Sequence, residues 1–164
     1  MATLNSAGMY YPLTKMNFFV SIEGVGQMAA FNEVTGIDAT VDVIEFRQGN
    51  AHSLAPVKIQ GLVKHGNITL KMGYTRNQDF KKWVLDCVDE RRKETPRKNV
   101  TIELIDISAG SPDTKVDAVK DSTLTWIFKD AWVTKYTGPD LNASTSEVAI
   151  ETIEIAYEEL TIPN

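Results

Sequence analysis

Two segments of the chain combine a period-two apolar pattern with acidic residues placed inside the pattern. Residues 34–47 read VTGIDATVDVIEFR, and residues 147–160 read EVAIETIEIAYEEL. Alternation of this kind is typical of β-strands with one buried face and one wet face. The acids occupy the positions expected on the wet face. The sequence therefore predicts long strands that carry carboxylates along one side.

Acidic strand faces of this length favour a sheet that is shared between subunits. A small monomeric barrel is expected to cover its wet side with mixed charge, whereas a sheet that lines an aqueous channel can carry a continuous wall of carboxylates. An acid–base pair is the competing interpretation. It is disfavoured because that chemistry needs two carboxyl groups in different environments, and here the glutamates repeat along one strand.

The remaining pattern predicts a mainly β protein, a two-sheet sandwich or barrel with one flanking α-helix. A bulge is expected at Asp130, because the apolar residues on its two sides follow different phases. Asn77 is the predicted N-cap of a helix that extends to Glu90. Its apolar stripe consists of Phe80, Trp83, Val84, Cys87 and Val88. Strands are expected at residues 17–22, 27–34, 37–46, 67–72, 98–107, 123–137 and 147–160.

Two stretches have no strand or helix period. Residues 47–64 are predicted to form a long loop with room for a short strand, and residues 108–121 form a second, polar loop. Loops of that size in compact domains are usually functional or disordered. We expect residues 47–61 to become ordered through contacts with a neighbouring subunit, because the apolar side chains there would otherwise stay wet.

Length and composition allow one domain. The 164 residues are predicted to form an N-terminal arm, residues 1–16, followed by a single domain, residues 17–164. The net charge of −5 argues against a nucleic-acid binder. One cysteine excludes an internal disulfide, and no signal peptide or membrane segment is recognisable. These features predict a protein that is made and kept in the cytosol, or exported as part of something without a signal peptide.

The sequence predicts no catalytic residue, no cofactor and no metal site. His52 and His65 lie in loop-like surroundings without metal-ligand spacing, and Cys87 falls on the apolar stripe of the helix, where a thiol acts as a small hydrophobe. Trp132 and Tyr136 have strand spacing, which indicates core or subunit contacts in preference to a ligand site.

An ordered set of motifs resembles one known family. FNEVTGID at residues 31–38 leads to VIEFRQG at 43–49 and GNITLKMG at 66–73. A helix with Trp83 follows, then IFKDAWVTK at 127–135 and the acidic strand at 147–160. In this order, over residues 17–162, the chain resembles the tail tube proteins of contractile phage tails and phage-tail-like contractile injection systems.

The resemblance implies a structural inner-tube protomer, and not an enzyme. It implies hexameric rings whose inner strands join into one lumenal barrel, with rings stacked inside a contractile sheath. The implied partners are further copies of the chain, the sheath, baseplate and tape-measure proteins, and DNA or effector cargo that passes nonspecifically through the lumen. The implied final location is a virion tail or a released injection particle.

In this family the segment that matches residues 47–61 reaches between subunits or rings. The expected subunit and ring contacts are therefore Arg47, Asn50, His52, Leu54, Val57 and Ile59, together with Trp132 and Tyr136. The expected lumen-facing acids are Asp42, Glu45, Glu151 and Glu154.

Two alternative functions stay open at this point. A ring protein of type VI secretion would share the architecture. A monomeric β-barrel that binds a small ligand would explain the strands but not the ordered motifs. A carboxylate-pair hydrolase is the least favoured alternative.

Overall fold

The computed structural model describes residues 18–28, 31–50, 52–73, 76–91, 94–104, 124–144 and 146–163. The predicted N-terminal arm, residues 1–16, and the predicted loop at 108–121 lie outside these residues. The described part forms one α-helix and ten β-strands: β1 (Phe18–Ile22), β2 (Gly26–Met28), β3 (Phe31–Thr35), β4 (Thr40–Phe46), β5 (Val57–Lys64), β6 (Ile68–Gly73), α1 (Gln78–Val88), β7 (Lys98–Leu104), β8 (Leu124–Thr137), β9 (Ile150–Ala156) and β10 (Glu159–Thr161).

Eight strands are joined by hydrogen bonds in the order β2-β1-β7-β8-β9-β6-β3, and β10 also pairs with β8. The long strand β8 belongs to two layers. Its first half pairs with β7 and β10, and its second half pairs with β9. The predicted two-sheet, mainly β fold with one helix is confirmed. It is a sandwich and not a closed barrel, since β2 and β3 end the order of the sheet.

The predicted bulge at Asp130 is confirmed and explains the change of apolar phase in β8. Lys98 pairs with Ala131, whereas Val100 pairs with Phe128, so β8 holds one residue more than β7 in this interval. Asp130 is the extra residue, and its backbone has a positive φ of 52°. Phe128 and Ala131 are consequently both buried, although simple alternation would place them on opposite faces.

Both layers contribute to one hydrophobic core. The ring centroids of Phe128 in β8 and Tyr157 lie 4.8 Å apart in an edge-to-face contact. The core consists of Val20, Ile22, Phe31, Ile68, Leu70, Met72, Phe80, Trp83, Val84, Val100, Ile102, Phe128, Ala131, Val133, Ile153, Ile155 and Tyr157. Within the described ranges, no helix is long and apolar enough to cross a membrane.

The helix α1 closes one side of this core. Asn77 is its N-cap, as predicted, and its side chain accepts hydrogen bonds from the backbone N–H groups of Asp79 and Phe80. Phe80, Trp83 and Val84 are buried, and the Trp83 indole donates to the carbonyl of Pro96 at 2.9 Å. Val88, predicted to pack with them, is instead 42% exposed, because it is the last residue of the helix and lies beyond the edge of the core.

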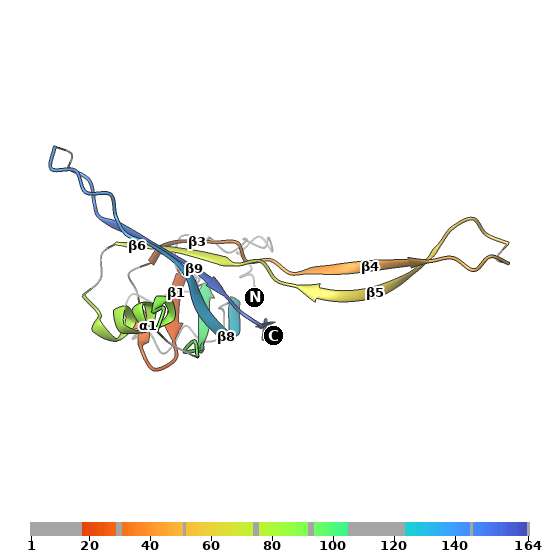
Figure 1. The fold of residues 1–164 in the computed structure, drawn as a ribbon, viewed down its shortest axis with the longest axis horizontal. Coiled ribbons are helices and arrows are strands. Elements are labelled where there is room, and N and C mark those ends of the chain that lie inside the picture. Colours follow the sequence, from red (N-terminus) through yellow and green to blue (C-terminus); the bar gives the residue numbers. More distant parts are fainter. Residues whose placement is uncertain are drawn as a thin grey trace, which may run out of the picture.

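The prediction of a long loop at residues 47–64 is wrong over its second half. Residues 57–64 form strand β5, which pairs with β4 in a separate two-stranded sheet. Figure 1 shows these two strands as a long hairpin, orange and yellow, that leaves the body of the molecule. We call residues 40–64 the long hairpin. Strand β4 falls within the strand predicted at 37–46, but β5 was not predicted. Its alternation covers only residues 57–60 and is broken by Gly61, after which Leu62 and Val63 are adjacent apolar residues.

Two other predicted strands are divided in the structure. The segment at 27–34 forms β2, which pairs with β1, and β3, which pairs with β6 in the other layer. The segment at 147–160 forms β9 and then β10, which pairs with β8. At each break between the two strands, the chain passes from one layer to the other. A local pattern of apolar residues does not show such a passage.

We expect Trp83→Ala to lower the free energy of unfolding by about 3 to 5 kcal/mol, because it leaves a cavity under α1 and removes the hydrogen bond to Pro96. Urea denaturation of the purified protein measures the loss. Lys82→Ala, at an exposed position on the same helix, is the control and should cost less than about 0.5 kcal/mol. Equal losses in both variants would contradict the assignment of Trp83 to the core.

Candidate assembly surfaces

The long hairpin exposes an unusual number of large apolar side chains. Ile44 lies opposite Ile59, and Phe46 lies opposite Val57, so these four side chains share one face of the hairpin. All four are about half exposed or more. We call them the apolar hairpin face. The opposite face pairs Val43 with Gln60 and Glu45 with Lys58. Further exposed apolar residues of the long hairpin are Val41, Leu54, Leu62 and Val63.

The hairpin combines two features that are typical of an interaction site. A two-stranded sheet is marginally stable by itself in water, and a contiguous exposed apolar patch marks an interaction site. Gly61 fits the irregular point in the hairpin, since a Cβ atom there would lie 2.9 Å from the Asp42 carbonyl oxygen. An ion pair between Lys64 and Asp42, with a nitrogen–oxygen distance of 2.7 Å, crosses the two strands near the body.

The base of the hairpin is tied to the core. The Tyr157 hydroxyl donates to the Asp38 carbonyl at 3.1 Å, and the Asp38 carboxylate accepts from the Gly66 backbone N–H at 2.7 Å. The His65 ring lies 5.2 Å from the Tyr157 ring between centroids. Burial, and secondarily the negative charge of Asp38, raise the pKa of the Tyr157 hydroxyl. These contacts fix the direction in which the hairpin leaves the body.

We expect Tyr157→Phe to lower the free energy of unfolding by about 1 kcal/mol, because the Asp38 carbonyl loses its donor. Amide hydrogen exchange should become faster at Thr40 and Val41, next to the base. Ser53→Ala, at the exposed far end of the hairpin, is the control for both measurements. Unchanged exchange at the base in Tyr157→Phe would show that the hydroxyl does not hold the hairpin.

A second surface is the outer face of the layer formed by β3, β6, β9 and the second half of β8. Lys71 of β6 forms an ion pair with Glu33 of β3 at 3.0 Å, and Asn67 donates to the Glu154 carboxylate at 2.9 Å. Alternation places on this face the polar residues Glu33, Thr35, Thr69, Lys71, Lys135, Thr137, Thr152 and Glu154, together with Ile150 and Trp132. We call it the polar sheet face. Its two acids and two lysines balance in charge.

The four acids predicted to face a lumen do not share one surface of the chain. Glu154 lies on the polar sheet face, whereas Asp42 and Glu45 lie on the long hairpin. Glu151 is only 3% exposed, so its prediction as a wet strand residue is wrong. It follows the same alternation as Ile153 and Ile155, which places it on the inner side of β9. Ile150, in the opposite phase of β9, is 41% exposed.

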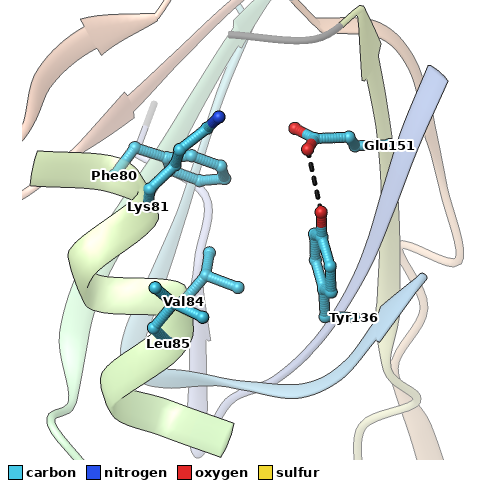
Figure 2. A pocket seen from close by; sticks show the side chains of 6 residues that line it. All are labelled: Phe80, Lys81, Val84, Leu85, Tyr136 and Glu151. Atoms are coloured by element: carbon cyan, nitrogen blue, oxygen red, sulfur yellow. Dashed lines mark hydrogen bonds between the residues drawn. The ribbon is translucent and has the colours of Figure 1, made fainter. Parts of the chain in front are cut away.

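Glu151 contributes to a pocket between the helix and the sheet. Its carboxylate accepts a hydrogen bond of 2.8 Å from the Tyr136 hydroxyl (Figure 2). The pocket has a volume of about 170 Å³ and is lined by Phe80, Lys81, Val84, Leu85, Tyr136 and Glu151. We call it the α1–β9 pocket. The pocket was not predictable from a local pattern, because its walls come from α1 and from residues of two strands that follow the helix residues of the pocket by more than 50 positions.

The eight predicted contact residues fall into two groups. Arg47, Asn50, His52, Leu54, Val57 and Ile59 are all exposed on the long hairpin. The other two lie on β8. Trp132 is half-buried beneath the Arg97 guanidinium, 4.6 Å from the ring centroid, and Arg97 also pairs with Glu158. Tyr136 is 42% exposed at the α1–β9 pocket. Their role in subunit contacts stays a prediction.

Nothing in the described parts of the chain is arranged as a metal centre, since no group of three or more His, Cys, Asp or Glu side chains converges there. The Cys87 thiol is half-buried on α1, 3.8 Å from the Pro96 carbonyl oxygen. The prominent features are therefore surfaces: an apolar hairpin that leaves the body, a charge-balanced polar sheet face, and a small apolar pocket.

The comparison with protein families identifies the family to which the chain belongs. The model of the T4-like virus tail tube protein gp19 family matches residues 14–161, and the chain belongs to this family. The resemblance predicted from the ordered motifs is thus confirmed: this is a tail tube protein of the contractile injection systems. No curated protein matches the chain.

Solved structures agree with the family. A chain of the PVC sheath–tube complex of an extracellular contractile injection system, in its extended state, is 25% identical with a TM-score of 0.71, over 93% of this chain and 92% of that one. A chain of the anti-feeding prophage tube-terminating cap shares the fold, with 23% identity and a TM-score of 0.73 over 98% and 97%. A type six secretion system protein shares it more distantly, at 12% identity and 0.52, over 88% and 81%.

Proposed function

We propose that this chain is the structural protomer of an inner tube, in which hexameric rings stack inside a contractile sheath and leave a channel for cargo. The observation that carries the proposal is the long hairpin. It exposes apolar side chains on a ribbon that leaves the body. Such a surface makes a monomer less soluble, but it can serve as a contact surface between subunits in an assembly. The protomer has no enzymatic activity in this proposal.

The proposed partners follow from the same role. Copies of the chain form the rings, and sheath, baseplate and tape-measure proteins surround or end the tube. The similar structures come from a sheath–tube complex, a baseplate and a cap, which supports these partners. The cargo, DNA or an effector, passes without specific binding. Assembly takes place in the bacterial cytoplasm, and the tube leaves as part of a virion tail or an injection particle.

We propose the polar sheet face as the main channel wall. It is threonine-rich, and its charges balance within one subunit, as shown by the Glu33–Lys71 pair. A charge-balanced wall does not bind a polyanion through counterion release, so a charged cargo slides past it. Of the four acids first expected in the lumen, Glu154 belongs to this wall. Asp42 and Glu45 reach the channel only if the hairpin lies along it.

A ring protein of type VI secretion is the second candidate. The similarity to a type six secretion system protein supports a common fold, and its identity of 12% carries no assignment of function. A monomeric ligand-binding module is separated from both candidates by size in solution, because it stays a monomer at micromolar concentration.

We expect Ile59→Asp to abolish ring or tube formation, because it places a charge in the centre of the apolar hairpin face. The fold of the body should be unaffected, with a free energy of unfolding within about 0.5 kcal/mol of the wild type. Sedimentation velocity and negative-stain electron microscopy measure the assembly. Gln60→Asp is the matched control, one residue further on the opposite face. Normal tubes from Ile59→Asp would contradict the role of this face.

The channel wall is tested by the position of a label. In a Cys87→Ala background, Thr152→Cys on the polar sheet face is coupled to a maleimide gold cluster before assembly. End-on images of rings should then show gold at the centre. Lys82→Cys, on the outer side of α1, is the control and should place gold at the periphery. Gold at the periphery for Thr152→Cys would place the polar sheet face against the sheath.

A further inference from the structure

The long hairpin joins the body at a gap in the strand pairing. The pairing of β3 with β6 ends at Thr35, and the pairing of β4 with β5 begins at Thr40. Between these points, residues 36–39 and the opposite residues 65–67 have no strand pairing with each other. We call these two segments the hairpin joint. Short segments between regular elements are the places where one part of a protein bends against another, so the direction of the hairpin depends on what holds this joint.

Asp38 connects three parts of the molecule at the joint. Its carboxylate accepts a hydrogen bond of 2.7 Å from the Gly66 backbone N–H, which links the chain that enters the hairpin to the chain that leaves it. Its carbonyl accepts a hydrogen bond of 3.1 Å from the Tyr157 hydroxyl, which links the joint to the core. Gly66 leaves no room for a side chain, since a Cβ atom there would lie 2.6 Å from Asp38 Oδ1. The carboxylate thus bridges the interval in which the strand pairing is missing.

Each side of the joint also has its own anchor on the body. On the entering side, Ile37 packs against the core, and Tyr157, which holds the Asp38 carbonyl, is only 7% exposed. On the leaving side, the Asn67 side chain donates to the Glu154 carboxylate of β9 at 2.9 Å. The Asp38 carboxylate is the link between these two anchored sides.

The length of the hairpin makes its position sensitive to the angle at the joint. A strand of seven residues such as β4 is about 23 Å long at a rise of about 3.3 Å per residue, so a bend of about 10° moves its far end by about 4 Å. A gap of about 1 Å already removes up to about half of a dispersion contact. The apolar hairpin face can therefore pack on a neighbouring copy only if the joint holds its angle closely.

The bond from Gly66 to the Asp38 carboxylate is exposed, which separates direction from stability. When an exposed hydrogen bond is removed, water replaces it, so little free energy of folding is lost. A variant without the carboxylate keeps the Asp38 carbonyl and its bond to Tyr157. The body should then fold as before, and the loss should appear in the direction of the hairpin.

We propose that Asp38 is a positioning residue for assembly, whose carboxylate holds the long hairpin of the free protomer at the angle that the contact in the tube needs. This inference rests on the proposed tube function and adds to it the residue that prepares the contact. A ring closes only if every copy repeats the same rotation relative to its neighbour. A hairpin that is already fixed in direction also loses less conformational freedom when the contact forms.

The critical concentration for assembly, measured by sedimentation, tests this role. Asp38→Ala should raise it about 10-fold, which corresponds to a released hairpin that takes the required direction about a tenth of the time. Asp38→Asn keeps an acceptor oxygen and should stay within about 2-fold of the wild type. Asp42→Ala is the matched control, because the Asp42 carboxylate pairs with Lys64 inside the hairpin and does not cross the joint. Its critical concentration should change less than about 2-fold.

The direction of the hairpin is measured separately on the monomer. In the Cys87→Ala background, spin labels on Gln60→Cys in β5 and Lys82→Cys in α1 report the distance between the hairpin and the body by pulsed electron paramagnetic resonance. The measurement is made at a concentration where sedimentation shows monomer only. The distance distribution should be broader with Asp38→Ala than with the wild-type residue or with Asp38→Asn.

The outcomes separate this inference from the proposed function. An unchanged distance distribution or an unchanged critical concentration for Asp38→Ala would overturn the positioning role and leave the tube function standing. A clearly lower midpoint of urea denaturation for Asp38→Ala would make the residue a structural one and would also overturn the role. A wild-type chain that never assembles would overturn the tube function and the role in assembly together, whereas the distance measurement would still decide whether Asp38 sets the angle.

Discussion

The double membership of β8 is the constraint on which the rest of the structure depends. One strand of 14 residues pairs with β7 and β10 in its first half and with β9 in its second. The extra residue at Asp130 lets Phe128, Ala131 and Val133 all reach the same core. Without this residue, alternation would point Ala131 and Val133 away from the core. The Asp130 backbone N–H also bonds to the Asn99 side chain, which ties the bulge to β7.

How far the sequence predicts this fold depends on where the buried surface lies. The helix, β6 and the bulge were predictable because each buries one face against the chain's own core, and burial leaves an alternation or a stripe in the residues. Strand β5 was not. Val57, Ile59, Leu62 and Val63 are apolar on a ribbon whose faces are both open in the single chain. Because these residues are not buried against the chain's own core, the core imposes no regular alternation on them.

The candidate surfaces divide in the same way. The contact residues from Arg47 to Ile59 were predicted from the family resemblance, and they lie exposed on the hairpin. The acidic wall was predicted from the alternation in residues 147–160, but Glu151 and Glu154 differ in sequence by an odd number and so must face opposite sides of β9. Lys71 and Lys135 complete the polar sheet face from other strands, so its balanced charge could not be predicted from one segment.

Folding and assembly are linked through the long hairpin. Among the described strands, β4 and β5 pair only with each other, and a two-stranded ribbon buries too little apolar surface to be stable alone. The base contacts orient it, but they do not cover Ile44, Phe46, Val57 or Ile59. In the proposed tube, a neighbouring copy that covered this face would stabilise the hairpin and the assembly by the same contact. The body would then be stable as a monomer and the hairpin would reach its full stability in the tube, so assembly, and not folding of the body, would respond to protein concentration.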